Sequence, residues 1–408
     1  MKKKLLLLHI TAIMMVSSVD AIAANVNGEL RRQTLSDVAS EFGNSSKNNA
    51  NRVFANQLVS AFDSIAKNGG SIDLIDSNGN IDLRISVGLR DDSGSTNVFF
   101  SKNSKNPLIV YTYNGLVNGK RAKLVRSGEE LGISWADGRS GEITLREFRK
   151  NGPEKKYRID KVASGLSGND VVNNPSHFEK MKSSSPISAP AAITAASKGP
   201  INFWVFIHND VAGKSKGADV SGIHAGYFSW FIDHLKEIIP GTTINIIYYD
   251  NNEIASVNYY ASDDSSKIKV LYELEHKVEN FIRKFDGYHL FGGKEEFDKK
   301  FGVLSNYRRN KFLLFTESNP SWTVAGYAAE GGHVGVASNY GYQIAAHEFG
   351  HMIGATHENA DVIYTGGWWC ETIMKSPNPL RSNCYRYSDE NIKLIRNYFS
   401  WSPASSSN

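Results

Sequence analysis

The stretch His347-Glu348-Phe349-Gly350-His351-Met352-Ile353-Gly354-Ala355-Thr356-His357-Glu358 is the most informative part of this 408-residue chain. On a helix, His347 and His351 lie one turn apart on the same face, so both imidazoles can bind one metal ion. Glu348 follows the first of them, where its carboxylate can hold a water molecule and accept its proton. Gly354 can adopt the left-handed conformation that ends a helix, which brings His357 back as a third ligand. Three protein ligands leave a fourth position for water, so the pattern predicts one catalytic Zn²⁺ ion.

The residues around the motif argue against the alternative, a solvated amphipathic helix that happens to carry histidines. Apolar side chains surround the three imidazoles, namely Ile344, Ala345, Phe349, Met352 and Ile353. Imidazoles in such a buried setting need a polar partner. Three of the 11 histidines of the chain fall within this one motif, and the extended motif is much rarer by chance than a bare HExxH. Metal binding is therefore the preferred interpretation.

The extended motif resembles that of the metzincin clan of zinc metalloproteases. The clan also has a methionine turn beneath its metal site, and residues 371–377, with Met374, resemble that turn; an ordinary core methionine is the alternative. The resemblance covers about 201–408. It implies an α/β (α+β) catalytic domain with a mixed twisted sheet, an active-site helix and the Met-turn. It also implies a zinc-dependent endopeptidase whose protein or peptide substrate binds in extended form along the edge strand of the sheet.

One residue near the motif matches an individual metzincin family, and another departs from the pattern of two such families. Glu358 follows the third histidine, as in astacins, where this residue bonds the new N-terminus formed by activation; a plain solvent-exposed glutamate is the alternative. Astacins and serralysins also have a tyrosine two residues after the methionine of the turn, where it aids the transition state. This chain has Ser376 there. Tyr385 and Tyr387 are the candidates to take over that role.

The N-terminus has the pattern of a secretory signal peptide. Three lysines precede an apolar run that ends at Val16, and Ala21-Ile22-Ala23 has the small residues of a cleavage site. The pattern predicts a signal peptide over 1–23 and a secreted protein, extracellular or periplasmic in transit; a retained anchor is the alternative. The apolar run is too short to span a bilayer, so no stable membrane insertion is expected. A net charge of +4 is too small to indicate nucleic-acid binding.

The only two cysteines, Cys370 and Cys384, flank the expected Met-turn. In an exported protein this pair predicts one disulfide around the floor of the site. Two metal-bound thiolates are the alternative. That alternative is disfavoured because three histidines already serve the metal.

A Ser/Ala/Pro-rich stretch over 183–200 lacks hydrophobic periodicity and predicts a linker. It divides an N-terminal pro-domain or accessory domain, 24–182, from the metalloprotease domain, 201–408. The N-terminal region is expected to be a small helix-plus-β domain. A helix is predicted over 51–67, and strands over 72–75 and 81–85 are joined by a turn at Asn78-Gly79. Further strands are expected over 97–100, 108–113, 123–125, 143–148 and 157–162.

The place of residues 24–182 before a protease domain predicts a zymogen. No cysteine precedes Cys370, so a cysteine cannot silence the metal. Ser167-Gly168-Asn169-Asp170 faintly resembles the Gly-Asp switch of astacins, but turn composition favours Asp170 as a solvated loop residue. The alternative is that 24–182 stays attached and binds substrate or a partner.

The C-terminal region is expected to alternate strands and helices. Strands are predicted over 202–207, 244–249, 311–316, 324–328 and 334–337, and helices over 222–237, 267–285 and 392–399. His208 and His333 are isolated on or beside strands. They are predicted to be surface or hydrogen-bonded core histidines and not further metal ligands.

Two classes of function follow. The first is a secreted zinc endopeptidase made as a zymogen, with a virulence factor or the enzymatic subunit of a toxin among its roles; a toxin would need an assembly partner. The second is a non-catalytic, zinc-stabilised secreted binding protein. A degenerate copy of the enzyme would be expected to lose Glu348 first, and Glu348 is present, which favours the enzyme.

Overall fold

The computed structural model describes residues 51–91, 95–136, 141–161, 170–172, 199–211, 220–365, 367–376, 378 and 380–400. The expected signal peptide and nearly all of the expected linker lie outside these residues. Within the described part of the chain, no helix combines the length and the apolar character needed to cross a membrane.

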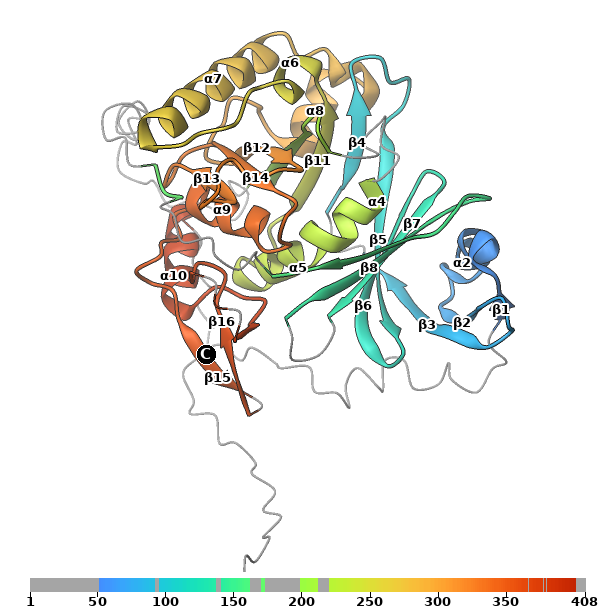
Figure 1. The fold of residues 1–408 in the computed structure, drawn as a ribbon. Coiled ribbons are helices and arrows are strands. Elements are labelled where there is room, and N and C mark those ends of the chain that lie inside the picture. Colours follow the sequence, from blue (N-terminus) through green and yellow to red (C-terminus); the bar gives the residue numbers. More distant parts are fainter. Residues whose placement is uncertain are drawn as a thin grey trace, which may run out of the picture.

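A single mixed sheet of 14 strands runs through the molecule, which confirms the expected α/β class (Figure 1). Its C-terminal half consists of β10 (Ile201–Ile207), β11 (Ile244–Asp250), β12 (Asn310–Thr316), β13 (Gly326–Ala328) and β14 (Val334–Ser338). In the order β13-β14-β12-β10-β11, the last four strands are mutually parallel. The edge strand β13 runs antiparallel to β14. β10 is an almost continuous apolar run because helices cover both of its faces.

The strands that precede the expected linker extend the same sheet. They are β1 (Asn51–Val53), β2 (Gly70–Ile75), β3 (Ile81–Arg90), β4 (Val98–Ser101), β5 (Leu108–Val117), β6 (Lys120–Ser127), β7 (Glu130–Ala136), β8 (Ile143–Arg149) and β9 (Lys155–Ile159). β4 pairs in parallel with β11, with Val98 opposite Ile247, and antiparallel with β5. The strand order therefore continues from β11 through β4 to β9. We call residues 51–161 the N-terminal module.

Two local predictions in the module have different outcomes. The β2–β3 hairpin is confirmed, with Ile72 opposite Ile85 and Gly79 at a φ of +81° in the turn. The helix expected over 51–67 is wrong in its first part. Asn51–Val53 pairs in parallel with β2, and helical structure is confined to η2 (Ala55–Gln57) and α2 (Leu58–Ile65). The exposed edge of β2 supplies the hydrogen bonds of that segment, which helical periodicity cannot reveal.

The helices lie on both faces of the C-terminal half of the sheet (Figure 1). One face carries α4 (Val220–Ile223), the π-helical turn η6 (His224–Phe228), α5 (Ser229–Ile238), α9 (Ile344–Met352) and α10 (Asp389–Tyr398). The other carries α6 (Asn252–Ala255), α7 (Asp264–Arg283), η7 (Gly287–Phe291) and α8 (Lys294–Phe301). A separate small sheet contains β15 (Val362–Thr365), β16 (Trp368–Glu371) and β17 (Ser382–Asn383). α9 carries the HExxH motif, so the first face is the one that positions the site.

The pairing of β4 with β11 joins the N-terminal module to the C-terminal half of the sheet. A substitution on β4 tests whether these two parts unfold together. Phe100 on β4 is fully buried among aromatic rings of the C-terminal half, including Trp204 and Tyr249. We expect Phe100→Ala to lower the free energy of unfolding by about 3–5 kcal/mol because it leaves a cavity. The whole protein should still unfold in one transition, measured by calorimetry and circular dichroism. Phe54→Ala, at a side chain 49% exposed, is the control. Two transitions, with only one of them shifted, would contradict a shared core.

Candidate metal centre

Four side chains from distant parts of the chain converge on one point. His347 and His351 come from α9, His357 from the loop that follows it, and Asp170 from a segment before the expected linker. One ligand atom from each lies within 4.8 Å of all the others. Asp170 oxygens lie 3.1 Å from Nε2 of His347, 3.2 Å from Nε2 of His357 and 3.8 Å from Nε2 of His351. The three histidines named from the sequence are therefore brought together, and Asp170 joins them.

The donor set fits a metal ion. Three imidazole nitrogens and a carboxylate oxygen are all ligands that Zn²⁺ accepts. Nε2 of His347 and Nε2 of His357 face one another at 2.9 Å, so they need a shared proton or cation between them. His351 is 1% exposed, and among the described residues neither of its ring nitrogens has a hydrogen-bond partner. Buried polar atoms without partners are costly, and a bound cation would satisfy them.

The charges of the cluster suit the same purpose. Burial lowers the pKa of His357 to about 4, with a further contribution from His347, and burial also lowers the pKa of His351. Both rings are therefore neutral and can offer a lone pair. Burial alone would raise the pKa of Asp170, but its contacts with the three imidazoles outweigh burial and hold that pKa well below its usual range. Asp170 is therefore a carboxylate within the cluster.

The end of α9 places His357 in the cluster, as the sequence predicts. Gly354 has a φ of +90°, the left-handed conformation that favours glycine. The N–H of Ala355 donates to the carbonyl of Gly350 at 2.8 Å, which closes the last turn of the helix. The chain then turns back, so that His357 faces the two histidines of α9.

The peptide next to His357 is held by a residue that sequence reasoning missed. The side-chain oxygen of Asn391 accepts a hydrogen bond from the N–H of Thr356 at 2.8 Å, and its side-chain nitrogen donates to the Thr356 carbonyl at 2.9 Å. Asn391 lies in the first turn of α10 and is fully buried. In the sequence it directly precedes the helix predicted over 392–399. Its position beside the apolar Ile392 is the one signal that it faces inward.

The expected Met-turn lies directly beneath α9. The carbonyl of Ile373 accepts from Nδ1 of His347 at 2.8 Å and from the side chain of Gln343 at 2.9 Å. This bond fixes the ring so that Nε2 of His347 points into the cluster. Met374 is fully buried, and a Cβ on Gly350 would lie 2.5 Å from its Sδ. The glycine in the middle of the motif therefore allows the methionine to pack against the helix.

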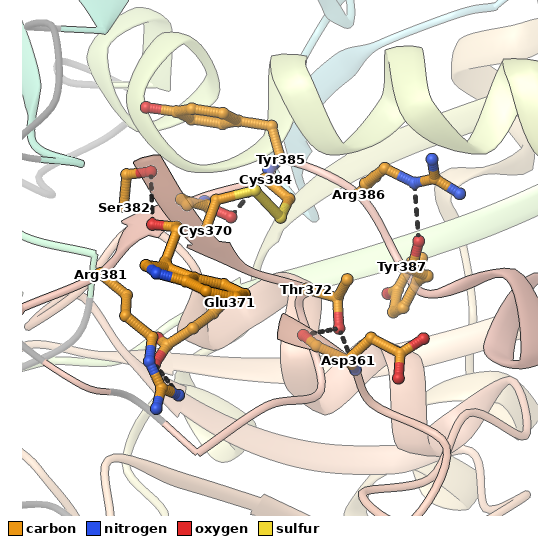
Figure 2. The surroundings of a disulfide bond; sticks show 12 residues. Asp361, Cys370, Glu371, Thr372, Arg381, Ser382, Cys384, Tyr385, Arg386 and Tyr387 are labelled. Atoms are coloured by element: carbon orange, nitrogen blue, oxygen red, sulfur yellow. Dashed lines mark hydrogen bonds and ion pairs between the residues drawn. A yellow bond between two sulfur atoms is a disulfide. The ribbon is translucent and has the colours of Figure 1, made fainter. Parts of the chain in front are cut away.

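The predicted disulfide between Cys370 and Cys384 is present (Figure 2). It joins the end of β16 to the segment after β17, and the N–H of Cys384 donates to the carbonyl of Glu371 at 2.9 Å. The bridge therefore closes the loop that contains Met374.

The other residues singled out from the sequence lie elsewhere. Tyr387 is fully buried and donates its hydroxyl to the carbonyl of Ala346 at 2.7 Å, on the core side of α9. Tyr385 packs against Tyr342 and Trp230. Neither tyrosine therefore presents its hydroxyl to the cluster, contrary to the role considered for them. Glu358 is exposed beside the cluster.

The two further histidines fit their expected structural roles. His208 is hydrogen-bonded to Asp210 at 2.7 Å. His333 is buried and stacks on Tyr307 with ring centroids 4.1 Å apart. Neither belongs to the metal-binding group.

Glu348 lies between α9 and the edge strand. Its side chain is nearly inaccessible, at 1% exposure, and among the described residues its Oε2 has no hydrogen-bond partner. Burial, followed by the nearby Asp170 carboxylate, raises its pKa well above the usual value. A Cβ on Gly326 of β13 would lie 2.6 Å from Oε1 of Glu348. Gly326 therefore leaves room for this carboxyl group beside the strand, and a glycine inside a predicted strand was the only signal of that close approach.

The placement of Asp170 corrects the sequence interpretation. Val171 pairs in parallel with Ala328 of β13. The N–H of Ala328 donates to the carbonyl of Asp170 at 3.2 Å, and the N–H of Val172 donates to the carbonyl of Ala328 at 3.1 Å. Asp170 is thus not a solvated turn residue. Turn composition describes local structure, whereas this residue is placed by pairing with a strand far away in the sequence.

No model of a known protein family matches this sequence, and no match is found among curated proteins. The case for a function therefore depends on the geometry of the metal centre and of the groups around it.

Asn391 forms two hydrogen bonds with the Thr356 peptide, so we predict that it contributes to metal affinity. We expect Asn391→Leu to weaken zinc binding by about 10–100-fold, the usual effect of losing a group that orients a ligand. The measurement is competition with a chromogenic chelator, and circular dichroism would verify folding. Asn397→Leu, at an exposed site on the same helix, should bind zinc normally. Equal affinities for the two variants would remove Asn391 from the metal centre.

Proposed function

We propose that this protein is a secreted zinc-dependent endopeptidase that is made as a latent precursor. The convergence of His347, His351 and His357 beside the buried Glu348 carries the proposal. Three histidine nitrogen donors are typical of catalytic zinc, and the motif resembles that of metzincins. The disulfide supports export from the cytosol, because such bonds persist in oxidising compartments.

The chain supplies the groups that peptide hydrolysis requires. A zinc ion held at the histidines makes water more acidic and polarises a carbonyl group. Glu348 accepts a proton from the attacking water and transfers it to the leaving amine nitrogen, as the C–O bond forms and the C–N bond breaks.

The edge strand β13 is where an extended substrate would bind. Its outer edge carries the N–H and C=O groups of Ala328, which can pair with another extended chain. Residues 170–172 already form this pairing. Gly326 on the same strand faces the Glu348 carboxyl. A peptide bound along β13 would therefore place its backbone next to the proposed base.

The same contacts support latency. Asp170 contributes a carboxylate to the histidine cluster, in the place that water would need. Val171 and its neighbours occupy the edge of β13. One short segment thus blocks both the metal and the substrate strand. Activation would require the displacement of this segment.

The second candidate function is a non-catalytic, zinc-stabilised binding protein. It needs the histidine cluster but gives no role to Glu348. A buried carboxyl oxygen without a described partner costs stability, so its presence beside the edge strand favours the enzyme.

Substitution of Glu348 tests the proposed reaction. We expect Glu348→Gln to lower kcat/KM on a quenched fluorescent peptide library by about 10²–10⁴-fold, the usual contribution of general acid–base catalysis. Zinc content should be unchanged because the histidines remain. A chelator should abolish wild-type activity and added zinc should restore it. Glu358→Gln, at the exposed neighbouring site, is the control. Equal turnover by Glu348→Gln and the wild type would leave only the binding protein.

Substitution of Asp170 tests latency. Charge-assisted contacts contribute about 1.5–3 kcal/mol each, so we expect Asp170→Ala to raise the initial rate of the uncleaved protein by about 10–100-fold. The measurement is the rate of peptide hydrolysis before any chain cleavage is visible on a denaturing gel. Asp160→Ala, at an exposed site nearby, should stay latent. An unchanged rate for Asp170→Ala would show that another group maintains latency.

A further inference from the structure

The N-terminal module shares the main sheet with the proposed protease part. β4 supplies the hydrogen-bonding partner of β11, so that the sheet does not end at β11. The side chains of Asn97 and Asn245 reinforce this junction from both sides. The first accepts from the N–H of Ile246 at 3.0 Å, and the second accepts from the N–H of Thr96 at 2.7 Å. Without the module, β11 would expose a row of unpaired backbone groups.

Part of the module also contributes to the apolar core behind the metal centre, beside a second core that consists of module residues alone. Figure 1 shows α4 and α5 between the strands of the module and the rest of the sheet. The buried cluster on this side contains five side chains of the module together with Phe349 and Met374 of the site. The module residues are Val110, Val125, Ile143, Leu145 and Ile159. Removing the module would therefore open the same core that supports α9.

The backbones approach so closely that only small residues fit between them. A Cβ on Gly132 of β7 would lie 2.5 Å from the carbonyl oxygen of Ser221 in α4. The hydroxyl of Ser134 donates to the carbonyl of Ala225 at 2.6 Å. Contacts of this kind are typical of an interior and not of a transient encounter.

A buried ion pair connects the end of the module to the Met-turn segment. Lys161 and Glu371 form a direct ion pair, with side chains 7% and 1% exposed. Nζ of Lys161 also donates to the carbonyls of Arg381 at 3.1 Å and Asn378 at 3.3 Å. Without Lys161, Glu371 would keep only weaker partners: the N–H of Asn378 at 3.1 Å and Nη1 of Arg381 at 3.4 Å. Loss of the lysine would leave a carboxylate buried close to the floor of the metal centre.

The same end of the module caps the motif helix. The carbonyl of Asp160 accepts from the N–H of Tyr342 at 3.1 Å, and the carbonyl of Lys161 accepts from the N–H of Gln343 at 3.2 Å. These two donors lie immediately before the first residue of α9, where helical N–H groups lack partners within the helix. The module thus orients the helix that carries His347 and Glu348.

We propose that the N-terminal module is a permanent subunit of the mature protein, and that activation displaces residues 170–172 from the histidines and from β13. After a cut in the 183–200 stretch, residues 51–161 remain bound to the C-terminal part as a second chain. This inference rests on the proposed function, because activation here is the onset of peptide hydrolysis. The association of the two fragments can be measured without any activity.

The test uses the full chain, with the recognition sequence of a site-specific protease in place of residues 186–190. The purified protein is cut, diluted stepwise and analysed by size-exclusion chromatography with light scattering. It is made in the wild-type and the Asp170→Ala backgrounds. We expect one species with the mass of the uncut chain, which separates into two bands only under denaturing conditions. In the Asp170→Ala background, the fractions that contain that species should hydrolyse the peptide substrate.

Separate elution of the two fragments, or loss of the C-terminal fragment by precipitation, would overturn the proposal. Activity in a C-terminal fragment that is free of the module would also overturn it. Co-elution in the absence of any hydrolysis would support the permanent subunit and count against the proposed protease instead.

Variants at the junction give a second measurement. In the cut protein, Lys161→Met should raise the dissociation constant of the two fragments by about 30-fold or more, because one partner of a buried ion pair is lost. Lys156→Met, at a side chain 60% exposed, should change it by less than about fivefold. If Lys161→Met fails to fold, Gly132→Ala addresses the same junction, with Gly199→Ala, at an open site, as its control. Dissociation constants equal to those of the controls would contradict the assigned contacts.

Discussion

The candidate metal centre is governed by one constraint: three imidazoles and two carboxyl groups lie together, with His351 and Glu348 buried and the other three partly buried. Such a group is unfavourable in an apolar interior unless its members share protons or a cation. The surrounding structure keeps these side chains in place despite that cost. The carbonyl of Ile373 orients His347, Gly354 turns the chain, and Asn391 fixes the peptide beside His357. Asp170 then supplies the negative charge that three converging imidazoles favour.

Much of this site could be predicted from the sequence because its spacing is local. His347 and His351 are one helical turn apart, and the glycine that ends the helix lies three residues further on, so short-range geometry is sufficient. The two cysteines could be paired because the chain has no others. Strands with continuous apolar runs, such as β10, were also found, within about one residue of their bounds.

What the sequence did not reveal depends on contacts between distant residues. Asp170 has the composition of a turn, and only the pairing with β13 shows that it enters the histidine cluster. Asn391 directly precedes the helix predicted over 392–399, but its partner Thr356 lies on the loop after α9. The strand at 51–53 looked helical because its periodicity was weighed without the open edge of β2. In each case a tertiary partner overrides a local preference.

The pairing of residues 170–172 with β13 separates the proposed inhibition from the stability of the fold. The segment is held by two backbone hydrogen bonds to Ala328 and by the contacts of Asp170 with the three histidines, whereas the module is anchored by a sheet, a core and a buried ion pair. Detachment of the segment is a local opening, which needs less free energy than global unfolding. Substitutions within residues 170–172 could therefore change the strength of the proposed self-inhibition without lowering the stability of the rest of the fold.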